Sequence, residues 1–317
     1  MSFHEQAVVV LTHNSMSVLP SCLGALEASN GDWDIVVTDN NSADGVDEYV
    51  YGHHPDATFI QTGDNLGYSG GNNFALSKLG RYGQVALVNP DVLVTPACLN
   101  IMSEDMYEDT GIGVVTPKVT LANTRVIDNL GGTMDWENGS PIYYGRGETD
   151  VGQYADKSRV ELAVGACMLL NMECVEDTGG FDERYFLYWE DSDFSKRAAS
   201  EGYDIICDPA AHAIHAKGNS TDKSSSALRT YYYNRNALLF FQEHGDEPDL
   251  LALCDKYIKK SLGYIVCKKG EQQVSELCGV AQALLDFQRQ RFGRYQDTGS
   301  DEQMLAFSLI AADLGRD

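Results

Sequence analysis

The chain has 317 residues, 43% of them hydrophobic and 10% aromatic, so it can bury a full core and is globular rather than disordered. Its 47 acidic and 23 basic residues leave a net charge of -24. This charge argues against general nucleic-acid binding, because such binding needs basic side chains that neutralise the phosphates. The N-terminus lacks the basic start and apolar run of a signal peptide, and no apolar stretch approaches the roughly 18 residues of a membrane span. We therefore expect a cytoplasmic protein.

The first 115 residues alternate short apolar runs with helical patterns. Runs typical of buried strands cover residues 7–11, 35–38, 58–61 and 85–88. Between them, Leu19, Leu23 and Leu26 fall on one helix face, and a second helix opens near Asn72. Strands separated by helices predict an α/β fold with a mainly parallel sheet, whose ligands bind at the carboxyl ends of the strands.

The rest of the chain changes character twice. Residues 119–170 have little helical period and predict mixed β structure and loops, ending in a strand at 162–170, and a helix follows at 192–201. After residue 227 the pattern is helical, with breaks near 245–248, 270 and 293–300. We place the boundary near residue 245, which gives a first domain of residues 1–244 and a C-terminal helical region of residues 245–317.

Polar residues follow three of the predicted strands, so they should gather at one edge of the sheet. They are Thr12, Asn14, Asp39, Asn41 and Asn89. Asp39 can accept a hydrogen bond from a pyrimidine N–H, although the sequence Asp-Asn-Asn-Ser also favours a turn.

A glycine-rich loop spans residues 65–73 after the third predicted strand. Its residues Gly67 and Gly71 permit close approach of the backbone to a ligand, and Asn65 and Asn72 lie beside them. The helix that opens there offers its N-terminus to an anion. The loop alone is weak evidence for a donor pocket.

Two acidic sites carry the strongest chemical signals. Asp91 ends an apolar strand after Asn89 and Pro90, and it offers a hard oxygen ligand to Mg²⁺ or Mn²⁺; a turn-capping aspartate is the alternative. Farther along, Glu190 and Asp191 precede a predicted helix, where acids also favour the positive helix end. Trp189 and the aromatic residues before it can stack on a sugar, or pack in a core.

Three further residues suit an anionic ligand. His215 can contact a metal or a phosphate, although a lone histidine is more often structural. Lys217 follows it and suits a diphosphate, and Arg235 can grip a phosphate with two parallel hydrogen bonds. Pairing of Arg235 with one of the many acids is the alternative.

The order of these segments resembles that of family 2 glycosyltransferases of the GT-A fold, and most closely their rhamnosyltransferase-type members. The resemblance covers about residues 5–242 and rests on Asp39, 65–73, 89–91, 165–170, 180–193, 215–220 and 231–236. It implies an inverting transfer of rhamnose or another hexose from a nucleotide diphosphate sugar, such as dTDP-rhamnose or a UDP-sugar. The implied acceptor is a hydroxyl of a polysaccharide or lipid-linked glycan.

The resemblance also assigns roles by position. Asp39 would contact the base, residues 65–73 would line the donor pocket, and Asp91 would bind Mg²⁺ or Mn²⁺. Asp191 would be the catalytic base, with Trp189 and Glu190 shaping the acceptor site. His215 would assist the metal or the diphosphate. Many relatives carry Asp-x-Asp where this chain has Asn89-Pro90-Asp91, so only one carboxylate is secure as a metal ligand.

Two other functions remain to be weighed. A sugar-phosphate nucleotidyltransferase would need a glycine-rich loop bearing Arg or Lys after the first strand, where this chain has Thr12-His13-Asn14-Ser15. A non-catalytic glycan- or partner-binding module would be favoured by loss of Asp91 or Asp191, and both are present.

Residues 253–269 form a predicted helix that is both basic and amphipathic. Its lysines are Lys256, Lys259, Lys260, Lys268 and Lys269. Such a helix can lie on an anionic membrane and bring the enzyme to a lipid-linked acceptor at the inner face of the membrane. The alternative is a solvated face packed on the first domain or on a partner in a homo-oligomer.

Overall fold

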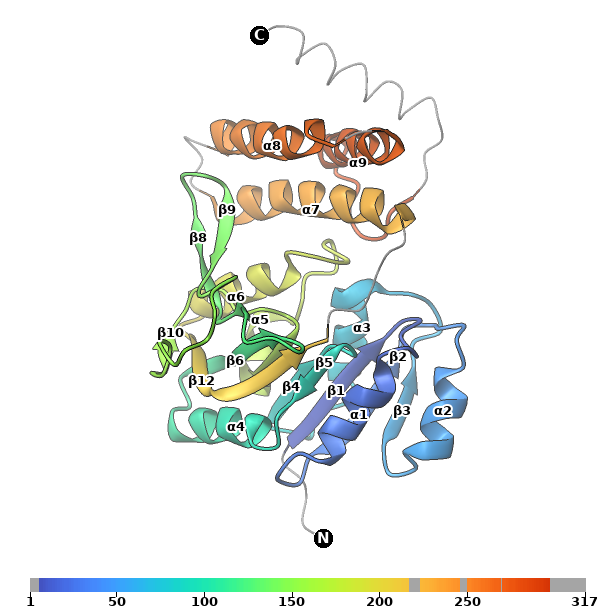
Figure 1. Cartoon of the computed structure of the whole chain (residues 1–317), viewed down its shortest axis with the longest axis vertical. Helices are drawn as coiled ribbons and strands as arrows, with labels where there is room; N and C mark the ends of the chain where they lie inside the picture. The colour runs from blue at the N-terminus through green and yellow to red at the C-terminus, as the bar shows by residue number, and fades with distance from the viewer. Residues whose placement is uncertain (1–5, 217–222, 246–249, 269, 297–317) are drawn as a thin grey trace, which may run out of the picture. The chain divides into compact units, whose positions relative to one another are not determined.

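The computed structural model describes residues 6–216, 223–245, 250–268 and 270–296, which form two compact units (Figure 1). The sheet unit comprises residues 1–134, 141–182 and 190–218, and the helical unit comprises residues 135–140, 183–189 and 219–317. The chain therefore passes between the units at several points, and residue 245 lies inside the helical unit. The division into domains of residues 1–244 and 245–317 stays a prediction.

One mixed sheet forms the centre of the sheet unit. In the described residues its strand order is β10-β12-β6-β11-β4-β1-β2-β3, and β5 and β7 join it beside β12 and β6. The strands are β1 (Gln6–Thr12), β2 (Asp34–Asp39), β3 (Thr58–Gln61), β4 (Gln84–Val88), β5 (Val92–Val94), β6 (Ile112–Leu121), β7 (Ile127–Asn129), β10 (Ser158–Arg159), β11 (Cys167–Asn171) and β12 (Asp204–His215). β8 (Gly132–Asp135) and β9 (Ser140–Tyr143) pair separately.

The predicted parallel pairing is confirmed around β1, which runs parallel to both β2 and β4. The carboxyl ends of these strands therefore meet at one edge. The pairing changes at β11, which runs antiparallel to β4 and to β6. The sheet is consequently mostly parallel but mixed.

Helices cover both faces of this sheet (Figure 1). They are α1 (Leu19–Glu27), α2 (Val46–His53), α3 (Gly67–Leu76), α4 (Cys98–Glu108), α5 (Met172–Thr178) and α6 (Glu190–Ser200). Because side chains alternate along a strand, Val8 and Val10 of β1 pack in the core with α1, α2 and α4, whereas Ala7 and Val9 pack in the core with α3, α5 and α6. Both faces are apolar, which explains the unbroken hydrophobic run of β1.

Several predicted boundaries were wrong. The second helix begins at Gly67 rather than near Asn72, and the strand expected at 162–170 is β11, which begins at Cys167. α6 begins at Glu190, so Asp191 lies inside the first helical turn and not before the helix. β12 went unpredicted because polar residues and Pro209 interrupt its apolar pattern.

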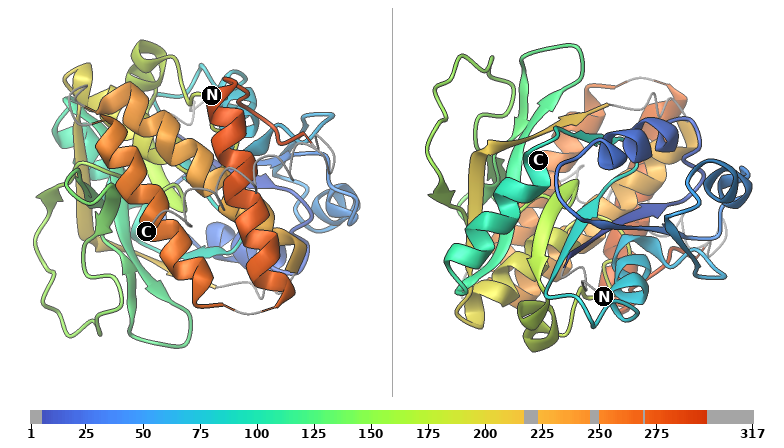
Figure 2. Two further views of the ribbon diagram at one scale, coloured as in Figure 1. Left: turned by 90° about the horizontal axis from the view of Figure 1, so that it is seen from above. Right: turned by 90° about the horizontal axis from the view of Figure 1, so that it is seen from below.

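The helical unit contains α7 (Lys223–His244), α8 (Leu250–Val266) and α9 (Glu271–Gln288). α7 packs against both other helices, which are drawn from orange to red in Figure 2. Within the described ranges, no helix is long and apolar enough to cross a bilayer.

The lysines of α8 have partners inside the helical unit. Lys256 Nζ donates to the carbonyl of Glu137 at 2.7 Å, and Lys260 Nζ donates to Ser140 Oγ at 3.1 Å. Lys259 pairs with Asp255, and Lys268, just beyond α8, pairs with a buried glutamate of α9. Lys269 lies outside the described residues. Lys256, Lys259 and Lys260 are nevertheless exposed, so contact of this helix with a membrane surface stays a prediction.

Candidate active site

Asp91, His215 and Asp128 form a cluster at the sheet edge. β5 runs antiparallel to β12 and pairs Val92 with His215, which brings the histidine beside Asp91. His215 Nε2 lies 3.2 Å from Asp91 Oδ2, and its Nδ1 lies 2.9 Å from Asp128 Oδ2. The amide of Ala216 also donates to the Asp91 carbonyl at 2.8 Å. The sequence predicted two members of this cluster and missed Asp128, which no local motif marks.

The two carboxylates favour the protonated form of His215. The hydrogen bonds to Asp128 and then to Asp91 raise its pKa to about 9, although burial opposes the shift. A divalent cation would take the place of this proton, because metals bind the neutral imidazole.

Asp91 and His215 together fit Mg²⁺ or Mn²⁺. A carboxylate oxygen and an imidazole nitrogen converge there, and both donor types bind these ions. Asp128 would hold Nδ1 and so direct Nε2 toward the cation. In the described part of the chain no three metal-ligating side chains form a group, so the other positions would fall to phosphate oxygens and water.

Asp191 is held in the first turn of α6 by hydrogen bonds to its carboxylate. Oδ2 accepts the amide hydrogen of Gly165 at 2.9 Å, and Oδ1 accepts that of Ser192 at 2.7 Å. Burial raises the pKa of Asp191, and these two hydrogen bonds oppose the shift. The carboxylate is thus fixed in place with lone pairs still available.

The neighbouring Glu190 differs in its environment. It is 5% exposed, and its Oε2 atom has no hydrogen-bond partner among the described residues. Burial, and then the charge of Asp191, raise the pKa of Glu190 well above its ordinary value. Burial, and then the charges of Glu190 and Asp191, raise the pKa of Tyr68, whose hydroxyl donates to the carbonyl of Gly165 at 2.6 Å. Of the two acids, Asp191 is therefore the one favoured to ionise.

A short segment connects the two acidic sites. Gly165 binds the Asp191 carboxylate, and the carbonyl of the next residue, Ala166, accepts the amide hydrogen of Asn89 at 2.9 Å. Asn89 lies two residues before Asp91. The two residues that directly precede β11, Gly165 and Ala166, therefore contact both the candidate base Asp191 and the segment that leads to the candidate metal ligand Asp91.

The other strand ends form a hydrogen-bonded loop cluster. Thr12 and Asp39 are register partners on β1 and β2, and both Asp39 oxygens accept the amide hydrogen of Ser42, at 3.0 and 3.2 Å. The turn alternative for Asp39 is therefore present. Asn14 Oδ1 accepts the amide hydrogen of Ala43 at 2.8 Å, and Asn41 has a left-handed φ of 63°. These residues order the loops after β1 and β2.

Asn40 joins this cluster to the glycine-rich loop, and sequence analysis missed it. Its Nδ2 lies 2.9 Å from the Gly67 carbonyl and 3.2 Å from Asn65 Oδ1, while its Oδ1 accepts the amide hydrogen of Leu66 at 2.9 Å. A buried side chain thus fixes the predicted donor loop from behind.

Gly71 and Asn72 require a correction. A Cβ on Gly71 would meet Leu11 Cδ1 at 2.6 Å, so this glycine allows α3 to pack closely on β1 rather than a ligand to approach. Asn72 is 1% exposed and donates to the Tyr68 carbonyl of its own helix. Both lie in the interior of the sheet unit and present no group to a donor.

The predicted phosphate contact of Arg235 is also wrong. Its side chain is fully buried in the helical unit, and its guanidinium donates to carbonyls of Gly293, Arg184 and Tyr185 at 2.7 to 3.0 Å. These partners occupy the groups that a phosphate would need. Lys217 lies outside the described residues.

Trp189 packs in a core, as the alternative for these aromatics proposed. It is 5% exposed, and its ring centroid lies 5.0 Å from that of Phe240 and 5.7 Å from that of Phe241. The indole is therefore not free to stack on an acceptor sugar.

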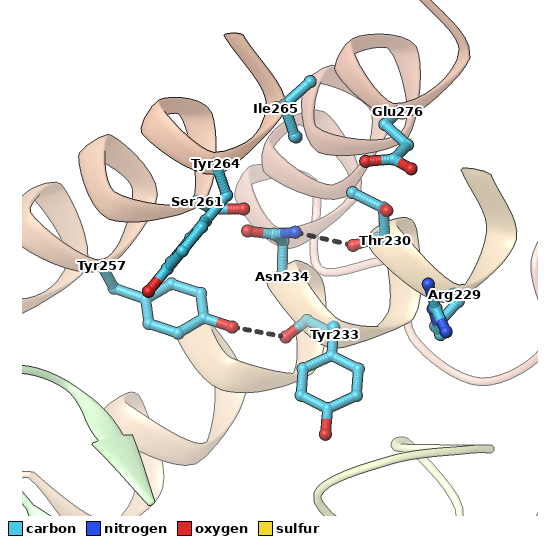
Figure 3. Close-up of a pocket in the computed structure, with 9 residues that line it drawn as sticks. All are labelled: Arg229, Thr230, Tyr233, Asn234, Tyr257, Ser261, Tyr264, Ile265 and Glu276. Atoms are coloured by element: carbon cyan, nitrogen blue, oxygen red, sulfur yellow. Dashed lines mark hydrogen bonds between the residues drawn. The ribbon is translucent and has the colours of Figure 1, made fainter. Parts of the chain in front are cut away.

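The helical unit has a pocket of its own, of about 380 Å³, between α7, α8 and α9 (Figure 3). It is lined by Arg229, Thr230, Tyr233, Asn234, Tyr257, Ser261, Tyr264, Ile265 and Glu276. Tyr257 donates to the Tyr233 carbonyl at 3.3 Å, and Asn234 Nδ2 donates to the Thr230 carbonyl at 2.7 Å. Asn234 thus faces the other helices, and among the described residues its side chain bonds within α7 alone.

Comparison with known proteins agrees with this architecture. An L-rhamnosyltransferase of Mycobacterium tuberculosis that acts on N-acetylglucosaminyl-diphospho-decaprenol is 24% identical over 259 residues, 75% of this chain and 84% of that protein. The low-salt glycan biosynthesis hexosyltransferase Agl10 of Haloferax volcanii is 27% identical over 219 residues, 65% of this chain and 66% of that protein.

Solved structures share the fold. A mannosyltransferase from Pyrobaculum calidifontis in complex with GDP-Man and Mn²⁺ aligns with a TM-score of 0.57 at 16% identity, covering 99% of this chain and 88% of that one. The family model described as glycosyl transferase family 2 matches residues 7–179, more than half of the chain. With its GT-A sheet and acidic strand ends, this chain belongs to glycosyltransferase family 2.

Proposed function

We propose that this glycosyltransferase moves rhamnose or another hexose from a nucleoside diphosphate to a hydroxyl of a polysaccharide or lipid-linked glycan, with inversion at the anomeric carbon. Asp191 is the catalytic base, and Asp91 with His215 forms the site for Mg²⁺ or Mn²⁺. Thr12, Asn14, Asp39, Asn41, Asn65 and Gly67 hold the donor from the loops at the sheet edge.

One observation carries the proposal: two chemically different acidic sites are tied to one segment. Gly165 holds Asp191, and Ala166 holds the strand end that leads to Asp91. Sugar transfer needs both kinds of acid, one for a cation that neutralises the diphosphate and one to accept a proton.

In the proposed reaction, Asp191 accepts the proton of the acceptor hydroxyl while that oxygen attacks the anomeric carbon. The bond between that carbon and the diphosphate oxygen breaks, and the diphosphate leaves with the electron pair. The amides of Gly165 and Ser192 keep the carboxylate oriented, and its partial burial strengthens it as a base because its pKa is raised. A cation at Asp91 and His215 would stabilise charge on the leaving diphosphate.

The proposed donor and acceptor classes draw on the relatives. One relative is named for rhamnose transfer to N-acetylglucosaminyl-diphospho-decaprenol. One structural neighbour holds GDP-Man with Mn²⁺, and another holds UDP-GlcNAc. We therefore place dTDP-rhamnose and UDP-sugars first among donors and a lipid diphosphate-linked sugar first among acceptors.

A thermal-shift screen of nucleotide sugars with and without Mn²⁺ tests the binding part of the proposal. A ligand that binds only the folded state raises the melting temperature, by an amount that grows with its concentration over Kd. We expect a shift for at least one nucleotide sugar that is larger with Mn²⁺ and absent from Asp91→Ala. An identical response of the variant and wild type would refute the metal site.

A further inference from the structure

The loop at Glu183–Trp189 has an unusual backbone. Phe186, Tyr188 and Trp189 have left-handed φ angles of 64°, 69° and 75°, although none of them is a glycine. Bulky residues rarely adopt this conformation, and it persists only where surrounding contacts determine it strongly. The loop leads directly into α6, and Asp191 is the second residue after Trp189.

Asn236 of α7 holds this loop by its backbone. Its Nδ2 lies 2.8 Å from each of three carbonyl oxygens, those of Tyr185, Leu187 and Tyr188. A carboxamide nitrogen carries two hydrogens and accepts none, so it suits a group of carbonyls. Asn236 is fully buried, so water cannot replace these bonds.

Arg235 fixes the orientation of that amide. Its Nε donates to Asn236 Oδ1 at 2.9 Å, which turns Nδ2 toward the loop. Its Nη2 lies 3.0 Å from the carbonyls of Arg184 and Tyr185, so it holds the start of the same loop. Two neighbouring residues of one helix thus bind four carbonyls of this loop, those of residues 184, 185, 187 and 188.

The rings of the left-handed residues rest on the same helix. Phe186 stacks on Tyr232 with ring centroids 5.3 Å apart, and the ring centroids of Tyr188 and Tyr233 lie 4.8 Å apart. Trp189 packs on Phe240 and Phe241. The polar contacts set the backbone, and the ring contacts keep the side chains from turning away.

We propose that Arg235 and Asn236 are positioning residues of the transferase, because they hold the 183–189 loop in its left-handed conformation. The loop conformation in turn sets where α6 begins and therefore the position of the Asp191 carboxylate. The helical unit then serves catalysis through the covalent connection of the loop to α6. This inference rests on the proposed role of Asp191 as base.

Asn236→Ala tests it against Asn234→Ala, a matched control. Both asparagines are buried on α7, but among the described residues Asn234 bonds to its own helix alone, and it faces the pocket of Figure 3. We expect Asn236→Ala to lower kcat about 10²-fold, the usual effect of a displacement near 1 Å at the reacting groups, with unchanged donor Kd. Asn234→Ala should keep both values at a similar melting temperature. A kcat loss equal in the two variants would overturn the proposal.

Trp189 reports on the loop without any activity measurement. The chain has three tryptophans, so Trp33→Phe with Trp136→Phe leaves Trp189 as the fluorophore. In that background we expect Asn236→Ala to increase acrylamide quenching of Trp189, and Asn236→Asp, which keeps the shape but lacks the donors, to do the same. Unchanged quenching in both would overturn the proposal, as would increased quenching with normal kcat.

The two proposals fail in different ways. Near-normal turnover of Asp191→Asn would refute the base and leave the Trp189 quenching result intact. Normal quenching and kcat in Asn236→Ala, with turnover lost in Asp191→Asn, would refute the positioning role alone.

Discussion

The sheet unit and the helical unit both bury polar groups, but they treat them differently. In the sheet unit, Glu190 Oε2 has no hydrogen-bond partner among the described residues, and burial raises the pKa of both Glu190 and Asp191. In the helical unit, the N–H groups of Arg235 and Asn236 donate hydrogen bonds to carbonyl oxygens of the same unit. We propose that the unpaired oxygen of Glu190 and the held carboxylate of Asp191 serve the ligand site, whereas the donors of Arg235 and Asn236 support the fold of the helical unit.

The strongest way to break this comparison is Asp191→Asn. The amide keeps the shape but cannot accept the hydroxyl proton, so turnover should fall by about 10² to 10⁴ with donor affinity preserved. Asp193→Asn is the control, because Asp193 lies in the same helix and pairs with Arg197. Steady-state kinetics and calorimetry of donor binding measure the two effects. A larger loss of kcat in Asp193→Asn than in Asp191→Asn would indicate that Asp193, and not Asp191, is the base.

The cluster of Asp91, Asp128 and His215, proposed as the metal site, offers the next largest effect. Asp91→Ala should abolish most Mn²⁺-dependent binding of nucleoside diphosphate, and Asp128→Ala should weaken it about 10- to 100-fold by freeing the His215 ring. Asp150→Ala, which removes the partner of Lys118 in the same unit, should leave it unchanged. Calorimetric titration measures all three. Equal affinities for wild type and Asp128→Ala would remove Asp128 from the site.

Glu190→Gln should stabilise the protein in a pH-dependent way. The folded-state pKa of Glu190 is raised above its unfolded value, so the wild type loses stability as pH rises above about 4.5, and the neutral variant does not. The advantage of the variant should vanish below that pH and reach about 2–4 °C in Tm near neutrality, the effect of about 1 kcal/mol. Melting curves across pH test this prediction. It would be contradicted if the Tm of the variant minus the Tm of wild type were smaller at pH 8 than at pH 5.

The smallest effect is expected from the α8 lysines. The double variant Lys256→Gln, Lys260→Gln removes two contacts to residues 137 and 140 and should lower Tm by no more than about 2 °C, because exposed charge contacts are weak. Binding to anionic vesicles should be equally low for both proteins. If wild type bound anionic vesicles at low salt and the double variant did not, the result would support the membrane-surface hypothesis.

Much of the fold followed from local pattern. β1, β2, β4 and α1 were predictable because parallel strands buried on both faces leave apolar runs, and α1 repeats leucine at helical spacing. β3 was also found, but it is an edge strand whose four residues are exposed or half-buried. β12 was not, since its pairing with β6 and β5 overrides an irregular pattern that no local rule reads as a strand.

The candidate site divided along similar lines. Asp91 and Asp191 could be found because each belongs to a motif at an element boundary. Asp128 and Asn40 could not, because their importance comes from partners 87 residues away for Asp128 and 25 to 27 residues away for Asn40. Arg235 was misassigned for the opposite reason, since a sequence does not say whether a guanidinium faces a phosphate or buried carbonyls.

The most direct test of sugar transfer is an NMR time course of the wild-type protein with Mn²⁺, dTDP-rhamnose or a UDP-sugar, and a lipid diphosphate-linked N-acetylglucosamine. We expect the donor to be consumed and a glycoside to form whose anomeric configuration is opposite to that of the donor, with Asp191→Asn slower by at least about 10². A product that retains the donor configuration, or equal rates for the two proteins, would contradict the proposed mechanism.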